Sequence, residues 1–517
     1  MIEYLDIDKF INKKADLYNF VNPFFNEKYR ESHNFFYIMD ALLIYKNYLD
    51  NLFLKVDSNI RLDINQKIAV LSQNKNVLII AGAGSGKTTT VAAKIKFMVD
   101  ILKINPSEIL LLSYTNEAVL EMKKIICDKF DIDVTILTFH KFAILLTQNK
   151  KKIVENIGFN FNTFWSKFKV YLYLYLFYDL TISDIRNETI NYITAFNDMI
   201  KDCNKKYYER ASYKWNFKVL LFHKIYLEYL KHINIENQCV TFDQLIEDAI
   251  KLDKYLSHFK YILIDEYQDI SNQRFVLIKK YTKAENSHLM CVGDDWQTIF
   301  SFAASDITKI LDFQNSFIDT KILKILMTYR NSQELVNVAG TFVMRNSKQI
   351  KKKLHSIKSL KRPIEFIYYS NPKEKIARII LKLNLLFSAN PNIKIAFLLR
   401  YTFDIKELLD GKHFILKEGK LFYKSNQIFY YTVHTSKGLG FDYVFLLNNK
   451  KGYYGFPANR KQRSLFKEEK NCYEERRLFY VALTRTKNKV YLVTPVKHAS
   501  LFTKEIKKIL KKNKYLI

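Results

Sequence analysis

The sequence has little proline, glycine or cysteine. Seven prolines and twelve glycines in 517 residues argue against long flexible linkers. None of the five cysteines forms a Cys-x-x-Cys pair, so we expect no zinc site and no iron–sulfur cluster. Their odd number and scattered positions fit a reducing compartment. They are Cys127, Cys203, Cys239, Cys291 and Cys472.

Targeting and membrane-spanning segments are also missing. The start of the chain, Met1 to Asp6, lacks the basic residues and apolar run of a signal peptide. The most apolar aromatic stretch, Tyr171 to Tyr178, is too short to cross a bilayer. We therefore expect a cytoplasmic protein with no membrane partner.

Basic residues are abundant. Lys and Arg number 82 against 52 Asp and Glu, which gives a formal net charge of +30. Such an excess favours a polyanionic partner such as nucleic acid. A lysine-rich composition spread over solvated faces explains the charge equally well. Because 48% of the residues are hydrophobic, the chain can form large packed cores.

Short apolar runs separated by helix-like segments predict buried parallel strands with crossover helices, an α/β fold. The runs are 77–80, 109–112, 261–264, 289–292, 395–399 and 443–447. Their order predicts two α/β lobes, the first interrupted by a helical insertion. We expect a helical N-terminal extension (1–60), a first lobe (61–145 and 240–322), an insertion (146–239) and a second lobe (323–517) that ends in a basic helix.

The strongest motif is Ala81-Gly82-Ala83-Gly84-Ser85-Gly86-Lys87-Thr88. It follows an apolar strand and precedes a helix-like segment, the context that a phosphate-binding loop requires. Its glycines let backbone N–H groups surround phosphate oxygens. Lys87 can neutralise the β- and γ-phosphates, and the Thr88 hydroxyl can ligate Mg²⁺. The alternative is a glycine-rich turn without a function.

A pair of carboxylates, Asp265 and Glu266, follows the apolar run 261–264. Parallel sheets bind ligands at the carboxyl ends of their strands. We assign Asp265 to Mg²⁺ and Glu266 to the attacking water. Alone, the pair would equally be an ordinary acidic strand end.

The same segment, Asp265-Glu266-Tyr267-Gln268-Asp269, resembles a box of the UvrD/Rep-like superfamily 1A DNA helicases. Other boxes of that family occur in the family's order over residues 62–495. The box at 292–300, which resembles the third helicase motif, has an Asp-Asp-Trp-Gln form closest to that of helicase IV enzymes. These boxes are 62–66, 81–88, 113–122, 138–140, 265–269, 292–300, 328–332, 432–439 and 474–485.

The resemblance implies two RecA-like P-loop lobes that hydrolyse ATP between them. Arg330 and Arg485 would stabilise the γ-phosphate as the bond breaks, although each alone could be a surface ion pair. Gln297 would sense that phosphate, Gln66 would bind adenine, and Tyr329 would stack on it. The implied nucleotide contacts are Gln66, Ala81, Gly82, Ala83, Gly84, Ser85, Gly86, Lys87, Thr88, Thr89, Lys94 and Tyr329.

The resemblance also implies contacts to single-stranded DNA and to junctions of single- and double-stranded DNA. Aromatic side chains can stack on any base, but in a chain with 40 Phe and 35 Tyr they can equally belong to a core. The two histidines can equally be structural. The implied DNA contacts are Tyr114, Thr115, Asn116, Thr138, His140, Phe300, Phe302 and His434.

The sequence departs from the family pattern at three places. Gly440 stands where the box at 432–439 normally continues with Glu. Lys94 replaces an arginine that the family has beside the nucleotide, and Lys lacks the planar fork of Arg. Only about 100 residues separate Arg330 from Thr432, so most of the large insertion in the family's second lobe is absent.

Two functions agree with these patterns. The first is an ATP-dependent DNA translocase or helicase in DNA repair or replication restart, with 3′-to-5′ travel implied by the resemblance. The second is a DNA-sensing ATPase subunit that licenses a protein partner, for example a nuclease in antiviral defence. A degenerate motor that only binds DNA is disfavoured, because Lys87, Glu266 and Arg485 are all present.

Overall fold

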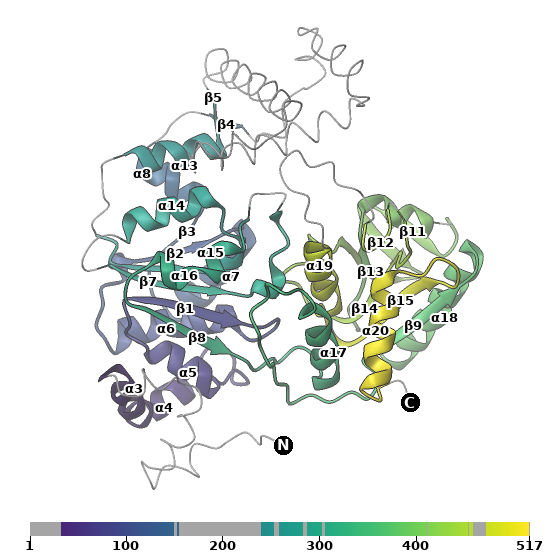
Figure 1. Cartoon of the computed structure of the whole chain (residues 1–517), viewed down its shortest axis with the longest axis horizontal. Coiled ribbons are helices and arrows are strands. Elements are labelled where there is room, and N and C mark those ends of the chain that lie inside the picture. The colour runs from purple at the N-terminus through teal and green to yellow at the C-terminus, as the bar shows by residue number, and fades with distance from the viewer. Residues whose placement is uncertain are drawn as a thin grey trace.

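The computed structural model shows two α/β lobes side by side (Figure 1). It describes residues 33–148, 152–154, 239–252, 258–282, 287–301, 305–409, 411–452, 454–458 and 472–515. Most of the insertion expected at 146–239 therefore lies outside the described residues, as do residues 1–32 and Phe302. Among the helices in these ranges, none combines the length and apolarity needed to cross a bilayer.

The first lobe contains a six-stranded sheet in the order β3-β2-β6-β7-β1-β8. Every neighbouring pair of strands in it is parallel. The strands are β1 (Asn76–Ala81), β2 (Ile109–Ser113), β3 (Thr135–Thr138), β6 (Tyr261–Ile264), β7 (His288–Gly293) and β8 (Thr320–Ile325). The apolar runs predicted as strands of this lobe are confirmed.

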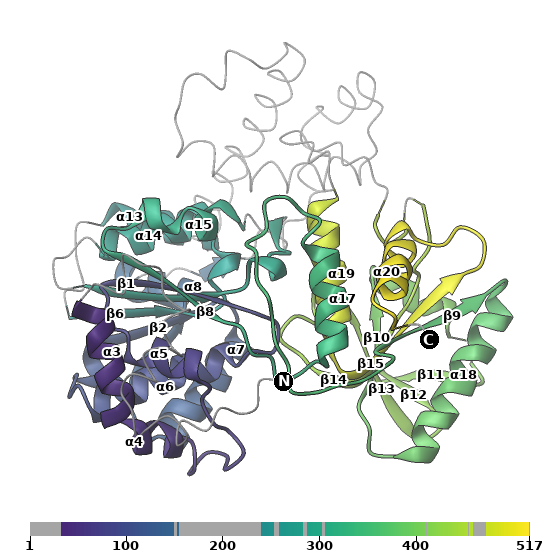
Figure 2. The same cartoon turned by 60° about the horizontal axis from the view of Figure 1, so that its bottom comes forward.

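Both faces of this sheet are covered, which explains why its strands are continuously apolar. Val77 and Ile79 of β1 enter one core, and Leu78 and Ile80 enter the other. Helices α3, α5 and α6 lie on one side of the sheet, and α8, α13 and α14 lie on the other (Figures 1 and 2). The helices of this lobe are α3 (His33–Ile44), α4 (Lys46–Asn51), α5 (Ile64–Leu71), α6 (Lys87–Asp100), α7 (Asn116–Lys123), α8 (Phe139–Thr147), α13 (Phe242–Lys251), α14 (Asn272–Tyr281), α15 (Thr308–Leu311) and α16 (Phe313–Ser316). A separate two-stranded sheet joins β4 (Lys152–Val154) to β5 (Cys239–Thr241).

The second lobe has a seven-stranded sheet in the order β11-β12-β13-β10-β14-β15-β9. Its last five strands are parallel, and β11, β12 and β13 form an antiparallel edge. The strands are β9 (Ile364–Tyr369), β10 (Ile395–Leu399), β11 (Phe414–Lys417), β12 (Lys420–Tyr423), β13 (Asn426–Thr432), β14 (Phe441–Leu446) and β15 (Thr486–Pro495). The predicted α/β class is therefore confirmed for both lobes.

The helices of the second lobe separate into two groups. Helices α17 (Gln333–Val343) and α19 (Tyr473–Leu483) lie toward the first lobe, and α18 (Pro372–Ala389) lies on the far side (Figures 1 and 2). Helix α20 (Leu501–Lys512), the predicted basic C-terminal helix, buries Phe502 and Ile506 in the same core as α17 and α19. In the described residues between Arg330 and Thr432, the helices and strands belong to this sheet and its cover.

The chain leaves the first sheet through β8. Lys324 and Ile325 still pair with Ile80 and Ala81 of β1, just beyond the boundary expected at 322. As a proposal, we therefore place the change of lobes after Ile325.

Candidate nucleotide site between the lobes

The glycine-rich loop connects β1 to α6 and is closely approached from two directions. Gly84 and Gly86 have φ angles of 70° and 76°, a region that glycine adopts without strain. A Cβ at Gly84 would lie 2.6 Å from the Cβ of Arg330, and one at Gly86 would lie 2.7 Å from Gln66 Nε2. Helix α6 starts at Lys87, so its N-terminus points into the loop, where it favours an anion. Within the predicted motif, Ala81 ends β1, Gly82 to Gly86 form the loop, and Thr88 and Thr89 lie in the first turn of α6.

The carboxylates predicted for catalysis meet the lysine of this loop. Glu266 follows β6, the neighbour of β7 in the sheet, and its Oε1 lies 3.2 Å from Lys87 Nζ. Asp265 accepts a hydrogen bond of 2.9 Å from the backbone N–H of Glu266. The structure thus brings together Lys87, Asp265 and Glu266 from separate parts of the sequence.

The two carboxylates have opposite pKa shifts. Burial, with the charge of Glu266, raises the pKa of Asp265 to about 7. Burial also opposes ionisation of Glu266, but the charges of Lys87 and Lys437 outweigh it and lower the pKa of Glu266 to about 2. Glu266 is therefore the ionised partner of Lys87. Because the pKa of Asp265 is raised mainly by burial, a cation placed beside its carboxylate would favour the charged form.

A segment of the second lobe is bonded directly to the glycine-rich loop. The Thr328 hydroxyl donates to the carbonyl of Ala83 at 2.7 Å, and the Tyr329 N–H donates to the carbonyl of Gly84 at 3.0 Å. These bonds place the next residue, Arg330, against the loop. The predicted arginine thus lies beside the loop, although about 240 residues separate the two in the sequence.

The second predicted arginine, Arg485, is linked to Gln297 across the lobes. Its Nη2 donates to Gln297 Oε1 at 3.0 Å, and Gln297 Nε2 donates to Asp294 Oδ2 at 2.6 Å. Arg485 is only 1% exposed. Burial, together with the charge of Arg330, lowers the pKa of Arg485 to about 9. Two buried cations close together favour an anion between them.

Within the part of the chain that the structure describes, two buried polar atoms beside the loop have no hydrogen-bond partner: Arg330 Nη1 and Ser85 Oγ. Buried polar groups are usually paired, so such exceptions point to a missing partner. Phosphate oxygens would satisfy both atoms. Gly440, the departure from the family pattern, lies close by, since a Cβ there would be 3.4 Å from Arg330 Nε. A side chain at 440 would contact this guanidinium.

Sequence reasoning missed Lys352, which connects the lobes. Its side chain is fully buried, with Nζ 2.5 Å from Asp294 Oδ1 and 2.8 Å from Asp295 Oδ1. It also donates to the carbonyl of Ala81 at 3.0 Å and lies over the ring of Trp296 at 4.6 Å. One cation therefore joins the end of β1 to the box that contains Gln297.

Lys437 was also missed, although it lies in a quoted box. Its Nζ contacts Asp269 Oδ2 at 2.5 Å, donates to the carbonyl of Gln297 at 3.0 Å and lies 3.9 Å from Glu266 Oε2. Burial raises the pKa of Asp269 to about 6, against the opposing charge of Lys437. Lys437 of the second lobe therefore forms ion pairs with the box at 265–269 in the first lobe.

The residues predicted to bind adenine form one cluster. The Tyr329 hydroxyl donates to Asp63 Oδ2 at 2.9 Å, and Asp63 caps α5 through the backbone N–H of Gln66 at 2.9 Å. The Gln66 amide accepts from the Asp63 N–H and donates to the carbonyl of Ser85. Both ends of this amide are thus used within the chain, and adenine binding by Gln66 stays a prediction. Asp63, a helix-capping residue, was missed.

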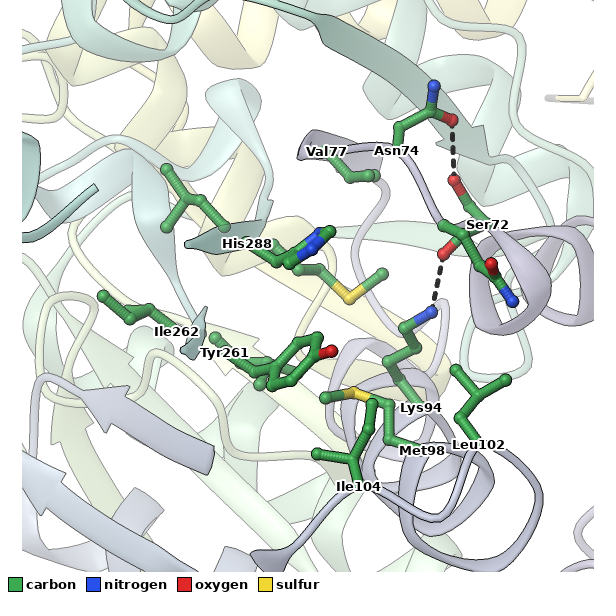
Figure 3. A pocket seen from close by; sticks show the side chains of 14 residues that line it. Ser72, Asn74, Val77, Lys94, Met98, Leu102, Ile104, Tyr261, Ile262 and His288 are labelled. Atoms are coloured by element: carbon green, nitrogen blue, oxygen red, sulfur yellow. Dashed lines mark hydrogen bonds between the residues drawn. The ribbon is translucent and has the colours of Figure 1, made fainter. Parts of the chain in front are cut away.

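The structure does not support the predicted nucleotide contact of Lys94. Lys94 lies two turns along α6 from Lys87, beside Tyr261 and His288 at the amino ends of β6 and β7 (Figure 3). Its Nζ donates to the carbonyls of Val70 and Ser72 at 2.8 and 2.6 Å. The glycine-rich loop lies at the opposite, carboxyl edge of this sheet, so the nucleotide contact of Lys94 stays a prediction.

The lysine lines a pocket of about 210 Å³ with apolar neighbours such as Met98 and Ile104 (Figure 3). Burial lowers the pKa of Lys94 to about 7. Because its ammonium group donates to the last carbonyls around the end of α5, it holds the helix that carries Gln66 against α6. Lys94 thus stabilises the packing of α5 against α6.

Several residues predicted to bind DNA follow two adjacent strands of the first sheet. Ser113 of β2 pairs with Thr138 of β3, so the segments after these strands lie at one edge. Thr115 and Thr138 cap α7 and α8 through their hydroxyls, and Asn116 is the first residue of α7. These caps give Thr115 and Thr138 a structural role besides the predicted one.

Tyr114 and His140 at this edge share a cationic neighbour, Arg274, which sequence reasoning missed. The Arg274 guanidinium lies 5.2 Å from the Tyr114 ring and 3.5 Å from His140 Nε2. His140 stacks on Phe242 at 4.1 Å. Burial, then the charge of Arg274, lowers the pKa of His140 to about 3, so this histidine is neutral at neutral pH.

Phe300 and His434 meet where the lobes face each other. Their ring centroids are 6.2 Å apart, and Lys437 Nζ lies 5.1 Å from the Phe300 centroid. Burial, followed by the charges of Arg400 and Lys437, lowers the pKa of His434 to about 4. Predicted DNA residues from both lobes thus lie together.

A parallel sheet, a glycine-rich loop on a helix N-terminus and an acidic pair at the carboxyl end of β6 define a P-loop protein of two lobes. The family model for the UvrD/REP helicase N-terminal domain matches residues 62–318. The chain belongs to the UvrD/Rep-like superfamily 1 helicases, and its two lobes are RecA-like.

Three relatives show how far the similarity extends. DNA helicase IV of Escherichia coli is 26% identical, over 93% of this chain and 75% of its own length. A probable DNA helicase of Mycoplasma pneumoniae is 28% identical, over 84% and 83%. ATP-dependent DNA helicase UvrD1 of Mycobacterium leprae is 26% identical, over 55% of this chain and 40% of its own length.

Proposed function

We propose that this protein is an ATP-dependent motor that moves along single-stranded DNA and separates strands at a junction. The observation that carries the proposal is the bonding of the second lobe to the phosphate-binding loop. Thr328 and Tyr329 donate to loop carbonyls, and the unpartnered Nη1 of Arg330 is buried beside them. ATP held there would be gripped by both lobes, so its hydrolysis would change how they meet.

In this proposal Lys87 and the loop N–H groups bind the phosphates, and Arg330 and Arg485 stabilise the charge that develops during transfer. Glu266, kept ionised by Lys87 and Lys437, accepts a proton from the attacking water. Thr88 and Asp265 would hold Mg²⁺, which would supply positive charge to stabilise the phosphates. Gln66 and Tyr329 face the base.

The coupling to DNA follows from the contact network. Gln297 is bonded to Arg485 on one side and to Asp294 on the other. Phe300, three residues further on, lies near His434 and Lys437. A change at the γ-phosphate would therefore reach the proposed DNA contacts through a few hydrogen bonds. We also propose 3′-to-5′ travel, on the basis of family membership alone.

Streptavidin displacement tests this proposal. DNA oligonucleotides carry biotin at either the 3′ or the 5′ end, and release of streptavidin is measured with ATP. We expect wild-type protein to clear the 5′-biotin oligonucleotide faster, and Lys87→Ala to clear neither. Clearance of neither end by the wild type, while ATP is hydrolysed, would contradict the motor.

A DNA-sensing ATPase subunit is the second candidate. It is favoured by the compact second lobe, in which α18 exposes Leu381 and Leu385 at 64% and 59%, as a partner-binding face would. DNA-stimulated hydrolysis without streptavidin release would support this candidate instead.

A further inference from the structure

The second lobe carries a cluster of three aromatic rings, Tyr401, Phe403 and Tyr454. The Tyr401 and Phe403 rings are stacked, with centroids 5.2 Å apart and planes 3° apart. Tyr454 meets both edge-on, at 5.7 and 5.3 Å. Aromatic clusters of this kind usually lie inside a core, where burial stabilises them.

This cluster is instead open to solvent. Phe403 is 45% exposed and Tyr454 is 46% exposed. Within the described ranges, every other Phe, Tyr or Trp with a described side chain is less exposed than these two. The most exposed aromatic rings therefore contact each other, which points to a binding surface rather than to scattered surface residues.

The cluster lies at the edge of the sheet where the lobes face each other. Arg400 and Tyr401 directly follow β10, and His434 follows β13, which pairs with β10 in parallel through Leu399 and Thr432. The charge of Arg400 acts on His434, and His434 is 6.2 Å from Phe300 of the first lobe. A path of side chains therefore leads from Phe300 through His434 and the Arg400 guanidinium to the cluster.

Charges near the cluster favour stacking over phosphate binding. The Arg400 guanidinium lies 4.6 Å from the Tyr401 centroid. The same guanidinium contacts Glu475 Oε1 at 2.5 Å, so its charge is largely compensated. Exposed rings beside a neutralised cation suit an uncharged, planar group, and a nucleic acid base is such a group.

We propose that Phe403 and Tyr454 form a base-stacking site in the second lobe, for one base of the strand that passes over Phe300 and His434. This proposal rests on the motor function proposed above. It gives the second lobe its own hold on a base, which alternating grip by two lobes requires. Stacking tolerates any base, so the site would not read sequence.

Binding of a fluorescein-labelled oligo(dT) tests the site. We expect Phe403→Ala and Tyr454→Ala each to weaken binding between about five- and hundredfold. The slope of log Kd against log salt should stay the same, because no phosphate contact is removed. Phe403→Tyr keeps a ring and should retain wild-type affinity. The control is Leu416→Ala, which truncates an exposed apolar side chain of the same lobe.

Three results would contradict the site. Unchanged affinity in both alanine variants would overturn it, as a surface for an apolar protein partner would predict. An equal loss in Leu416→Ala would show that the effect is not specific. If the wild type bound no single-stranded DNA, this result would contradict the proposed motor function itself, and the stacking site with it. Equal thermal midpoints for all variants control for folding.

Discussion

Arg485 of the second lobe donates to the Gln297 side chain of the first lobe over 3.0 Å. Gln297 in turn donates a hydrogen bond to Asp294, and Asp294 accepts another hydrogen bond from the buried Lys352. Hydrogen bonds and ion pairs between residues distant in sequence thus join the two lobes at the proposed ATP site.

Removal of Arg485 tests its proposed catalytic role. We expect Arg485→Ala to lower kcat for ATP hydrolysis by about 10³-fold, because an arginine that stabilises the transferring phosphate contributes at least that much. Arg476→Ala is the matched control, since Arg476 lies in helix α19, just before Arg485 in the chain, but pairs with Glu505. A kcat within a few-fold of the wild type in Arg485→Ala would contradict the role.

The link between Arg485 and Gln297 can be measured separately. If the two side chains act together, the double variant Arg485→Ala/Gln297→Ala should lose less activity than the product of the single losses. ATPase assays of the four proteins provide the cycle. Losses that multiply would show that the hydrogen bond carries no coupling.

Lys352→Met tests the buried ion cluster. The substitution leaves Asp294 and Asp295 buried without their cation, and such a loss costs about 3–5 kcal/mol of unfolding free energy. Urea unfolding measures it. Lys353→Met changes the exposed neighbour and should stay within about 0.5 kcal/mol of the wild type. Equal stabilities of the two variants would argue against the cluster.

Lys94 gives stability a specific pH dependence. Burial lowers the pKa of Lys94 in the folded protein to about 7, against 10.5 for an ordinary lysine. Between these values the unfolded chain holds one more proton, so stability rises with pH by about 1.4 kcal/mol per pH unit. Lys94→Met should remove this slope from urea unfolding measured between pH 7.5 and 9.5. Met98→Leu, in the same pocket, should keep it, and equal slopes in wild type and Lys94→Met would refute the assignment.

The net charge of +30 predicts salt-sensitive DNA binding. Each phosphate contact releases counterions, so the affinity for single-stranded DNA should fall steeply as salt rises. Fluorescence anisotropy at several salt concentrations measures the slope. A flat response would mean that the lysines serve another purpose.

The sequence predicted six strands of the two sheets, because buried parallel strands are continuous apolar runs. Val77–Ile80 and Ile395–Leu399 are examples, and both are strands in the structure. The glycine-rich loop was also recognisable, since it follows such a run. Both features are defined by neighbouring residues in the sequence, so each can be predicted without knowing the fold.

The missed residues share a different property. Lys352 could be recognised only from its ion pairs with Asp294 and Asp295, which are far from it in the chain. A single lysine in a lysine-rich sequence forms no pattern that predicts such a contact. Lys94 is a related case. Its place in the family pattern suggested a nucleotide contact, but two turns of helix α6 separate it from Lys87 and carry its side chain to the other edge of the sheet.

ATP hydrolysis with and without single-stranded DNA, for wild type and Lys87→Ala, tests the central claim most directly. We predict that DNA strongly stimulates the wild-type rate and that Lys87→Ala abolishes hydrolysis under both conditions, because Lys87 neutralises the phosphates. Equal wild-type rates with and without DNA would contradict an ATP site coupled to DNA between two lobes.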